Sequence, residues 1–180
     1  MDVTHRDDRR AAEARFRTVF SHLGAVTAYA RRRGSTDADG LAAEVMTIAW
    51  RRLADVPKDD PLPWLFATAR NLVFAEARRS ARAASLPATE PAAAVPEPQE
   101  LDPALSRALR SLSRLDREAL LLVAWEDLTP GQAARSLGIN PAAFRVRLLR
   151  ARRRLRARLE SPDPEDRHPV PLTQLDVEGT

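Results

Sequence analysis

The sequence has 180 residues, of which 44% are hydrophobic and 30% are charged, a composition typical of helical domains with apolar cores. It contains no cysteine, which excludes disulfides, cysteine-ligated zinc, iron–sulfur clusters and thiol nucleophiles. The net charge of +4 comes from two basic segments, residues 1–86 and 105–160, which alternate with two acidic ones. This alternation predicts two modules that bind a polyanion.

The first module is predicted to span residues 10–82 as a bundle of three helices. Apolar side chains recur at helical spacing over residues 16–30, and three arginines precede Gly34, as the helix dipole and the geometry of helix ends favour. A second helix is expected over residues 37–53. A third follows an Asp-Asp-Pro segment and continues to about Arg82.

Two segments are too rich in proline to form regular helices. Residues 83–103 and 161–180 together hold nine of the 14 prolines. The first segment, rich in proline and alanine, is predicted to be a flexible linker, and the second a disordered acidic tail.

The second module, residues 104–160, carries the strongest local signals. After two predicted helices, Thr129 is a capping residue followed by proline at the first helical position. That helix ends at Gly138, and Asn140, again followed by proline, opens the last helix. Two helices joined by a short glycine turn are typical of a helix-turn-helix. No segment alternates like a strand, so the fold class is expected to be all-α, with two small helical domains.

The last helix has two distinct faces. At 100° per residue, one face carries an apolar stripe that is predicted to face the core: Phe144, Leu148, Ala151, Leu155 and Leu159. Aliphatic and arginine side chains together occupy the opposite face, where thymine methyl groups, guanine edges and phosphates can be contacted in a DNA major groove. A solvated arginine-rich face with two stray aliphatic residues is the alternative. The predicted DNA-binding residues of this face are Arg145, Val146, Leu149 and Arg150.

Several segments of the second module resemble a known family. Residues 116–124, 128–134, 137–139 and 144–152 resemble region 4 of sigma-70-type RNA polymerase sigma factors. In that family this region reads the −35 promoter element. The resemblance implies DNA contacts at Arg145, Val146, Leu149 and Arg150. These are the same four residues that the spacing along the last helix places on its outer face.

The first module resembles region 2 of the same family. Residues 37–51 resemble the segment that docks on the largest polymerase subunit, which implies polymerase contacts by Asp37, Asp39, Leu41 and Glu44. The chain differs from the family at two positions of this segment. It has Gly40 where the family usually has an acid, and Ala43 where the family often has a glutamine.

The third helix resembles the segment that opens and reads the −10 element. Asn71, Phe74, Arg78 and Arg82 recur at positions i, i+3, i+7 and i+11, so they share one face. An amide, an aromatic ring and two cations suit a melted DNA strand. The alternative is that Phe74 packs on another helix and Asn71 is solvated. The predicted −10 residues are Arg70, Asn71, Phe74, Arg78 and Arg82, whereas Trp50, Trp64 and Trp125 are expected in the core.

The resemblance as a whole implies a small extracytoplasmic-function sigma factor that binds core RNA polymerase and promoter DNA and is held by an anti-sigma factor. No catalytic, metal-ligating or cofactor-binding motif is recognisable, so we expect no enzyme activity, cofactor, metal or small-molecule substrate. Without a signal peptide or a long apolar stretch, a cytoplasmic protein with no membrane contact is expected. Two alternatives stay open: a free-standing DNA-binding regulator, and a degenerate sigma paralogue acting as a protein-binding adaptor.

Overall fold

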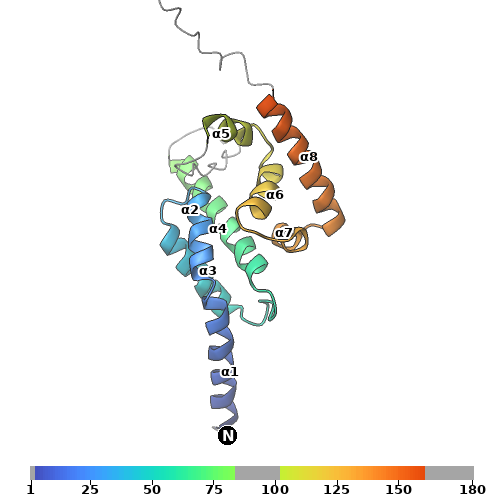
Figure 1. Cartoon of the computed structure of the whole chain (residues 1–180). Coiled ribbons are helices and arrows are strands. Elements are labelled where there is room, and N and C mark those ends of the chain that lie inside the picture. Colours follow the sequence, from blue (N-terminus) through green and yellow to red (C-terminus); the bar gives the residue numbers. More distant parts are fainter. Residues whose placement is uncertain (1–2, 84–101, 161–180) are drawn as a thin grey trace, which may run out of the picture.

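The computed structural model describes residues 3–83 and 102–160, which form eight helices and no strands (Figure 1). The expected all-α fold class is therefore confirmed. The predicted linker lies almost entirely, and the predicted tail entirely, outside the described residues. Among the described helices, none is long and apolar enough to cross a membrane. The helices are α1 (Val3–Phe20), α2 (Leu23–Arg32), α3 (Ala38–Arg51), α4 (Leu62–Ala83), α5 (Pro103–Arg110), α6 (Arg114–Ala124), α7 (Pro130–Leu137) and α8 (Pro141–Glu160).

The first domain contains four helices instead of the three that periodicity predicts. The expected first helix is interrupted between α1 and α2 at Ser21. The Ser21 hydroxyl donates a hydrogen bond of 2.7 Å to the Thr18 carbonyl. Such bonding of a serine back to the main chain competes with helix propagation. The first helix also begins at Val3, seven residues before the expected start of the domain. Its N-terminal half extends away from the rest of the molecule (Figure 1).

The core of the first domain lies between α2, α3 and α4, which pack against one another. Tyr29 of α2 stacks on Phe66 of α4 with ring centroids 4.8 Å apart, and both side chains are buried. Val45 and Ala49 of α3 are fully buried beside them. The long helix α4 thus has one face fixed in the core, which leaves the opposite face available for function.

The second domain is built from α5 to α8, with α8 packed against all three of the other helices. Leu121 and Leu122 of α6 are buried, as expected from their apolar run. Phe144, Leu148 and Ala151 of α8 are buried and Leu155 is partly buried, as predicted for the inward stripe. Leu159 is 43% exposed, so the prediction of burial is wrong there, one residue before the helix ends at Glu160.

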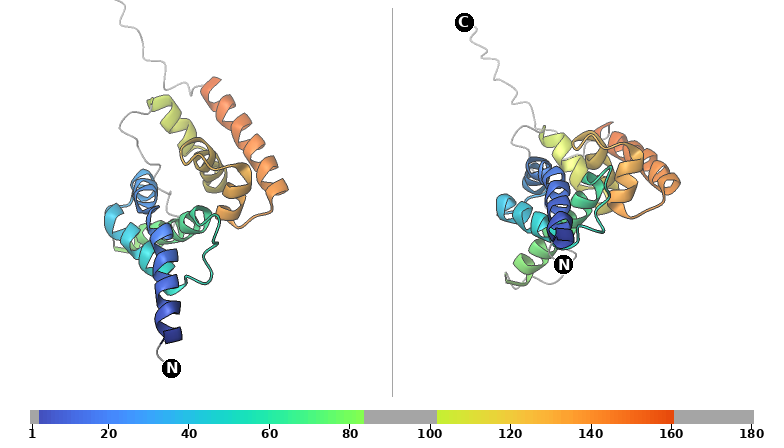
Figure 2. Two further views of the ribbon diagram at one scale, coloured as in Figure 1. Left: turned by 60° about the horizontal axis from the view of Figure 1, so that its bottom comes forward. Right: turned by 90° about the horizontal axis from the view of Figure 1, so that it is seen from below.

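The two domains are in contact. Helix α4 of the first domain packs against α7 of the second, and the buried apolar residues of both domains form one continuous cluster. Helix α8 lies on the side of the molecule away from α2 and α3 in all views (Figures 1 and 2).

Candidate nucleic-acid interface

Local hydrogen bonds define the helix-turn-helix. The Thr129 hydroxyl accepts from the Gln132 amide at 3.3 Å, and the Gln132 side chain accepts from the Thr129 amide at 2.9 Å, which forms a complete capping box. Gly138 ends α7 in the left-handed conformation, with φ of 67°, which favours glycine. The Asn140 side chain accepts from the Ala142 amide at 2.8 Å and so caps α8. The start and stop signals in the sequence are therefore used as predicted.

The outer face of α8 is open to solvent. Val146 is 48% and Leu149 is 52% exposed, and Arg145 and Arg150 beside them are exposed as well. Two aliphatic side chains left exposed between arginines suit the mixture of methyl groups, base edges and phosphates in a major groove.

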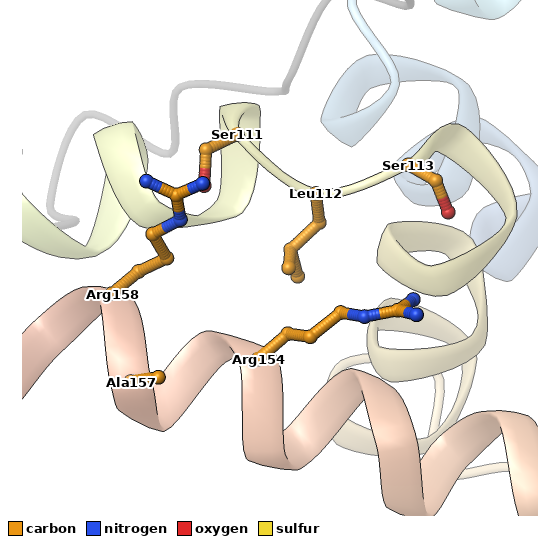
Figure 3. Close-up of a pocket in the computed structure, with 6 residues that line it drawn as sticks. All are labelled: Ser111, Leu112, Ser113, Arg154, Ala157 and Arg158. Atoms are coloured by element: carbon orange, nitrogen blue, oxygen red, sulfur yellow. The ribbon is translucent and has the colours of Figure 1, made fainter.

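A buried carboxylate anchors this helix to its own domain. The Asp116 side chain is 3% exposed and accepts hydrogen bonds from Arg147 at 2.8 Å and from Arg154. These two arginines lie seven residues apart, so one acid fixes two turns of α8. Figure 3 shows Arg154 projecting from α8 beneath the connection between α5 and α6, next to a shallow pocket of about 390 Å³.

The predicted −10 residues occupy one side of α4, but they differ in exposure. Asn71, Arg78 and Arg82 are exposed. Arg70 is half-buried, and within the described part of the chain its Nε atom is buried without a hydrogen-bond partner. Phe74 is half-buried because the Arg114 guanidinium of the second domain lies over its ring, 3.0 Å from the centroid.

The predicted polymerase-docking residues lie at the start of α3. Asp37 caps this helix by accepting a hydrogen bond of 2.8 Å from the Gly40 amide. Asp39 and Glu44 are exposed. Leu41 is only 8% exposed and packs in the core, because its helical position faces α2 and α4; the prediction of a polymerase contact there is not supported by its burial.

The expectation of a buried Trp50 is wrong. Trp50 is 44% exposed, and Phe20 of α1 is 47% exposed beside it. Phe16 packs beside them. Its ring centroid lies 5.1 Å from the ring centroid of Trp50 and 6.0 Å from that of Phe20. The three rings line a groove of about 500 Å³ between α1 and α3, which we call the aromatic patch. Trp64 and Trp125 are partly buried against the core.

A further group of residues was not predicted at all. Glu118 of α6 is buried and bound by Tyr29 of α2 and by Arg33 directly after that helix, across the contact between the domains. No local pattern marks these residues, because they lie 85 to 89 positions apart in the chain.

Two family models match the chain, "Sigma-70 region 2" over residues 19–83 and "Sigma-70, region 4" over residues 103–155. The chain is 30% identical, over 172 residues, to "RNA polymerase sigma factor NccH" of Alcaligenes xylosoxydans xylosoxydans. That alignment covers 85% of this chain and 92% of the relative.

Solved structures share the fold. The chain resembles CnrH, solved in complex with the cytosolic domain of CnrY, with a TM-score of 0.58 and 27% identity, over 84% of this chain and 94% of that one. It also resembles the sigma factor RpoE of Bartonella quintana, solved with the anti-sigma factor NepR, with a TM-score of 0.56 and 22% identity, over 81% and 96% of the two chains. The boundaries of both family models fall on the two domains described above.

Proposed function

Because the chain belongs to the sigma-70 family of RNA polymerase sigma factors, in its extracytoplasmic-function group, we propose how its two domains divide promoter recognition. It is an alternative sigma factor that binds core RNA polymerase and directs transcription initiation. Sigma factors are in general initiation factors without a catalytic activity of their own. In our proposal the domain of α1 to α4 binds polymerase and the −10 element, and the domain of α5 to α8 binds the −35 element.

The outer face of α8 is the observation that carries the −35 assignment. Its two exposed aliphatic residues, Val146 and Leu149, are held outward because Phe144 and Leu148 fix the opposite face in the core. Arg145 and Arg150 flank them, and both side chains are exposed. Bidentate contacts of arginine to guanine are the commonest specific contacts in the major groove.

We assign −10 recognition to the face of α4 that carries Asn71 and Phe74. The Asn71 amide can hydrogen-bond an extruded base, and the Phe74 ring can stack on one. Arg78 and Arg82 extend this face with two exposed cations that suit the phosphates of a single strand.

Polymerase docking is assigned to the exposed side of α3. Asp39 and Glu44 lie there, and Asp37 contributes a third carboxylate at the helix start. A side chain at position 40 would overlap the Asp37 carboxylate. The Asp37 carboxylate therefore lies where the first side-chain atoms of an acidic residue at position 40 would lie. We infer that Asp37 supplies the negative charge that the family usually carries at position 40.

A charge-relocation experiment tests this assignment. Asp37→Ser keeps a capping oxygen but removes the charge, and we expect weaker binding to purified core polymerase. The double variant Asp37→Ser/Gly40→Glu returns the charge to the usual position and should recover binding. Equal affinities of all three proteins for polymerase would contradict the assignment.

The aromatic patch extends the same side of α3. Gly40, Ala43, Thr47 and Trp50 are all exposed and recur at helical spacing, so a partner helix can approach closely and meet the indole. Buried tryptophans are frequent energetic centres of protein interfaces. Trp50→Ala should weaken polymerase binding about 30-fold, whereas Leu159→Ala, which removes a similarly exposed apolar side chain from α8, should not.

We further propose that an anti-sigma factor binds this chain, as the family membership implies. The Bartonella quintana relative was solved in such a complex.

A further inference from the structure

Arg70 of α4 is a cation whose charge the described part of the chain does not neutralise. It is half-buried, and its Nε atom is buried without a hydrogen-bond partner among residues 3–83 and 102–160. No carboxylate of these residues forms an ion pair with it. Charged groups away from water are normally paired, because an unpaired charge loses its hydration without compensation. Arg70 therefore retains hydrogen-bonding capacity for an anion from outside the chain.

This arginine lines a cavity of about 460 Å³ between the two domains. One wall of the cavity comes from α4, and the other comes from α6, the residue before it, and α7. Small-molecule sites in proteins have volumes of about 300–1,000 Å³ and combine apolar walls with a few polar groups. The cavity thus has the size of a ligand site.

The charges around the cavity favour an anion. Arg70 and Arg114 line it, whereas Glu118 is the acid among the lining residues. Both carboxylate oxygens of Glu118 already accept hydrogen bonds, from the Tyr29 hydroxyl and from Arg33. Because Arg33 balances the charge of Glu118, the lining keeps an excess of positive charge.

A phosphate group suits the polar side of this lining. The guanidinium of an arginine is a planar fork of donors that matches the oxygens of a phosphate. Ser113 lines the same cavity from the other domain. Its hydroxyl accepts a hydrogen bond of 3.3 Å from the Asp116 amide, so the hydroxyl proton can be donated to a ligand. Arg70 and Ser113 therefore offer donors to one anion from two sides.

A nucleobase suits the remaining lining. Phe74, Leu115 and Leu137 supply apolar surface. The Arg114 guanidinium lies over the Phe74 ring, and aromatic rings and guanidinium planes are the groups on which unpaired bases stack. Asn71 also lines the cavity, and an asparagine amide can pair with the N6 and N7 edge of adenine.

We propose that this cavity binds a free purine nucleotide, with its phosphate at Arg70 and Ser113 and its base at Phe74 and Asn71. The inference goes beyond the proposed function and does not depend on it, because the chemistry of the lining selects the ligand. A phosphate monoester carries up to two negative charges, which two arginines can balance, whereas a phosphate within a DNA strand carries one. A free nucleotide is therefore favoured over a nucleotide of a strand.

Calorimetric titration of the full free chain with adenosine 5′-monophosphate tests the site. We expect one nucleotide bound per chain and an unfolding midpoint that rises with nucleotide concentration, since a ligand of the folded state stabilises it. Adenosine lacks the charged group and should bind about 10- to 160-fold more weakly. Inorganic phosphate, which lacks the base, and the methyl ester of the nucleotide, whose phosphate resembles that of a strand, should both bind more weakly as well.

Two pairs of variants locate the binding. Arg70→Gln should weaken nucleotide binding by the same factor, whereas Arg79→Gln removes an equal charge from an exposed position of the same helix outside the cavity and should not. Leu115 is 46% exposed in the first turn of α6, where an acid is favourable for the helix, so substitution there preserves the fold. Leu115→Glu should repel the phosphate, and Leu115→Gln, which has the same size without the charge, should bind the nucleotide more tightly than Leu115→Glu.

Several results would overturn the proposal. Absence of nucleotide binding, or equal affinities for the nucleotide and adenosine, would exclude an anion site. Inorganic phosphate bound as tightly as the nucleotide would exclude recognition of the base, and an equally tight methyl ester would assign the site to a DNA strand. Equal losses in Arg70→Gln and Arg79→Gln, or equal affinities of Leu115→Glu and Leu115→Gln, would place the nucleotide elsewhere on the chain. None of these results would alter the proposed roles in promoter recognition.

Discussion

Glu118 of α6 accepts two hydrogen bonds from Arg33, which caps the C-terminal end of α2, so a carboxylate of one domain neutralises a buried cation of the other. Burial acts to lower the pKa of Arg33, but the neighbouring Glu118, Tyr29 and Glu126 together outweigh burial and hold that pKa above its usual value. Burial and the same carboxylate raise the pKa of Tyr29 well above its usual value. Arg33 thus stays charged and Tyr29 neutral near physiological pH, and each donates to Glu118.

Tyr29→Phe removes one of these donors and keeps the ring that stacks on Phe66. A hydrogen bond to a buried group contributes about 1 kcal/mol, so the free energy of unfolding should fall by about this amount. Urea titrations of the wild type and the variant measure the difference. An unchanged free energy of unfolding would mean that the hydroxyl does not support the interface.

Arg145→Ala and Arg150→Ala should each reduce transcription from a promoter with an intact −35 element by about 5- to 160-fold, since a specific arginine–base contact contributes about 1–3 kcal/mol. Core polymerase binding should be unchanged. Arg158→Ala is the matched control, because Arg158 is exposed on the same helix but lies outside the proposed face. An equal loss in the control would show that only net charge matters.

Asn71→Ala should impair strand opening more than formation of the closed complex. The amide can contact a base only after that base leaves the duplex, so duplex binding does not need it. Permanganate reactivity of the −10 thymines measures opening, and a gel shift measures the closed complex. Ser80→Ala, an exposed position on the opposite side of α4, should change neither. Proportionate loss of both signals in Asn71→Ala would contradict the assigned role.

Asp116→Asn should loosen α8. The carboxylate accepts from both Arg147 and Arg154, and hydrogen bonds between charged groups contribute about 1.5–3 kcal/mol. We expect a lower unfolding midpoint and weaker −35 binding, although Asp116 does not lie on the DNA face. Asp127→Asn serves as the control, because Asp127 is exposed and its positive φ of 51° suits asparagine. An unchanged midpoint in Asp116→Asn would exclude a positioning role.

Glu76→Gln should destabilise the first domain in a pH-dependent way. Burial acts to raise the pKa of the Glu76 carboxyl, but hydrogen bonds from Thr36 and Ser35 outweigh it and the pKa is lowered. A carboxyl with a lowered pKa stabilises the fold above the usual glutamate value of about 4.3, and this stabilisation is lost as the pH falls through the lowered pKa.

The difference in unfolding free energy between wild type and Glu76→Gln should therefore be largest at neutral pH, at about 1 kcal/mol, and shrink below pH 4. Urea titrations at pH 7 and pH 3.5 measure it. Glu13→Gln on the exposed side of α1 controls for general charge effects. A difference that is constant over this range would mean that ionisation of Glu76 does not matter.

The second domain could be predicted almost completely from the sequence, because its signals are local. Thr129, Gly138 and Asn140 act within one helical turn of themselves, and the apolar stripe of α8 recurs at helical spacing. For the same reason the exposed face of α8 could be named residue by residue.

The first domain and the interface could be predicted only in part, because their missing features depend on non-local packing. Trp50 is exposed although its type favours burial, since α1 covers only one side of it. Leu41 lies among acids in the sequence, yet it faces the core. The partners of Glu118 lie in α2 and directly after it, more than 80 residues away in the chain, and no periodicity joins them.

Run-off transcription with purified core polymerase tests the central claim most directly. The template would carry a promoter selected by this chain together with polymerase. We predict a transcript that depends strictly on the added chain and that falls when either Arg145 of the second domain or Asn71 of the first is replaced by alanine. No transcript at any concentration, with tight binding of the free chain to the same duplex, would contradict the account and favour a free-standing regulator.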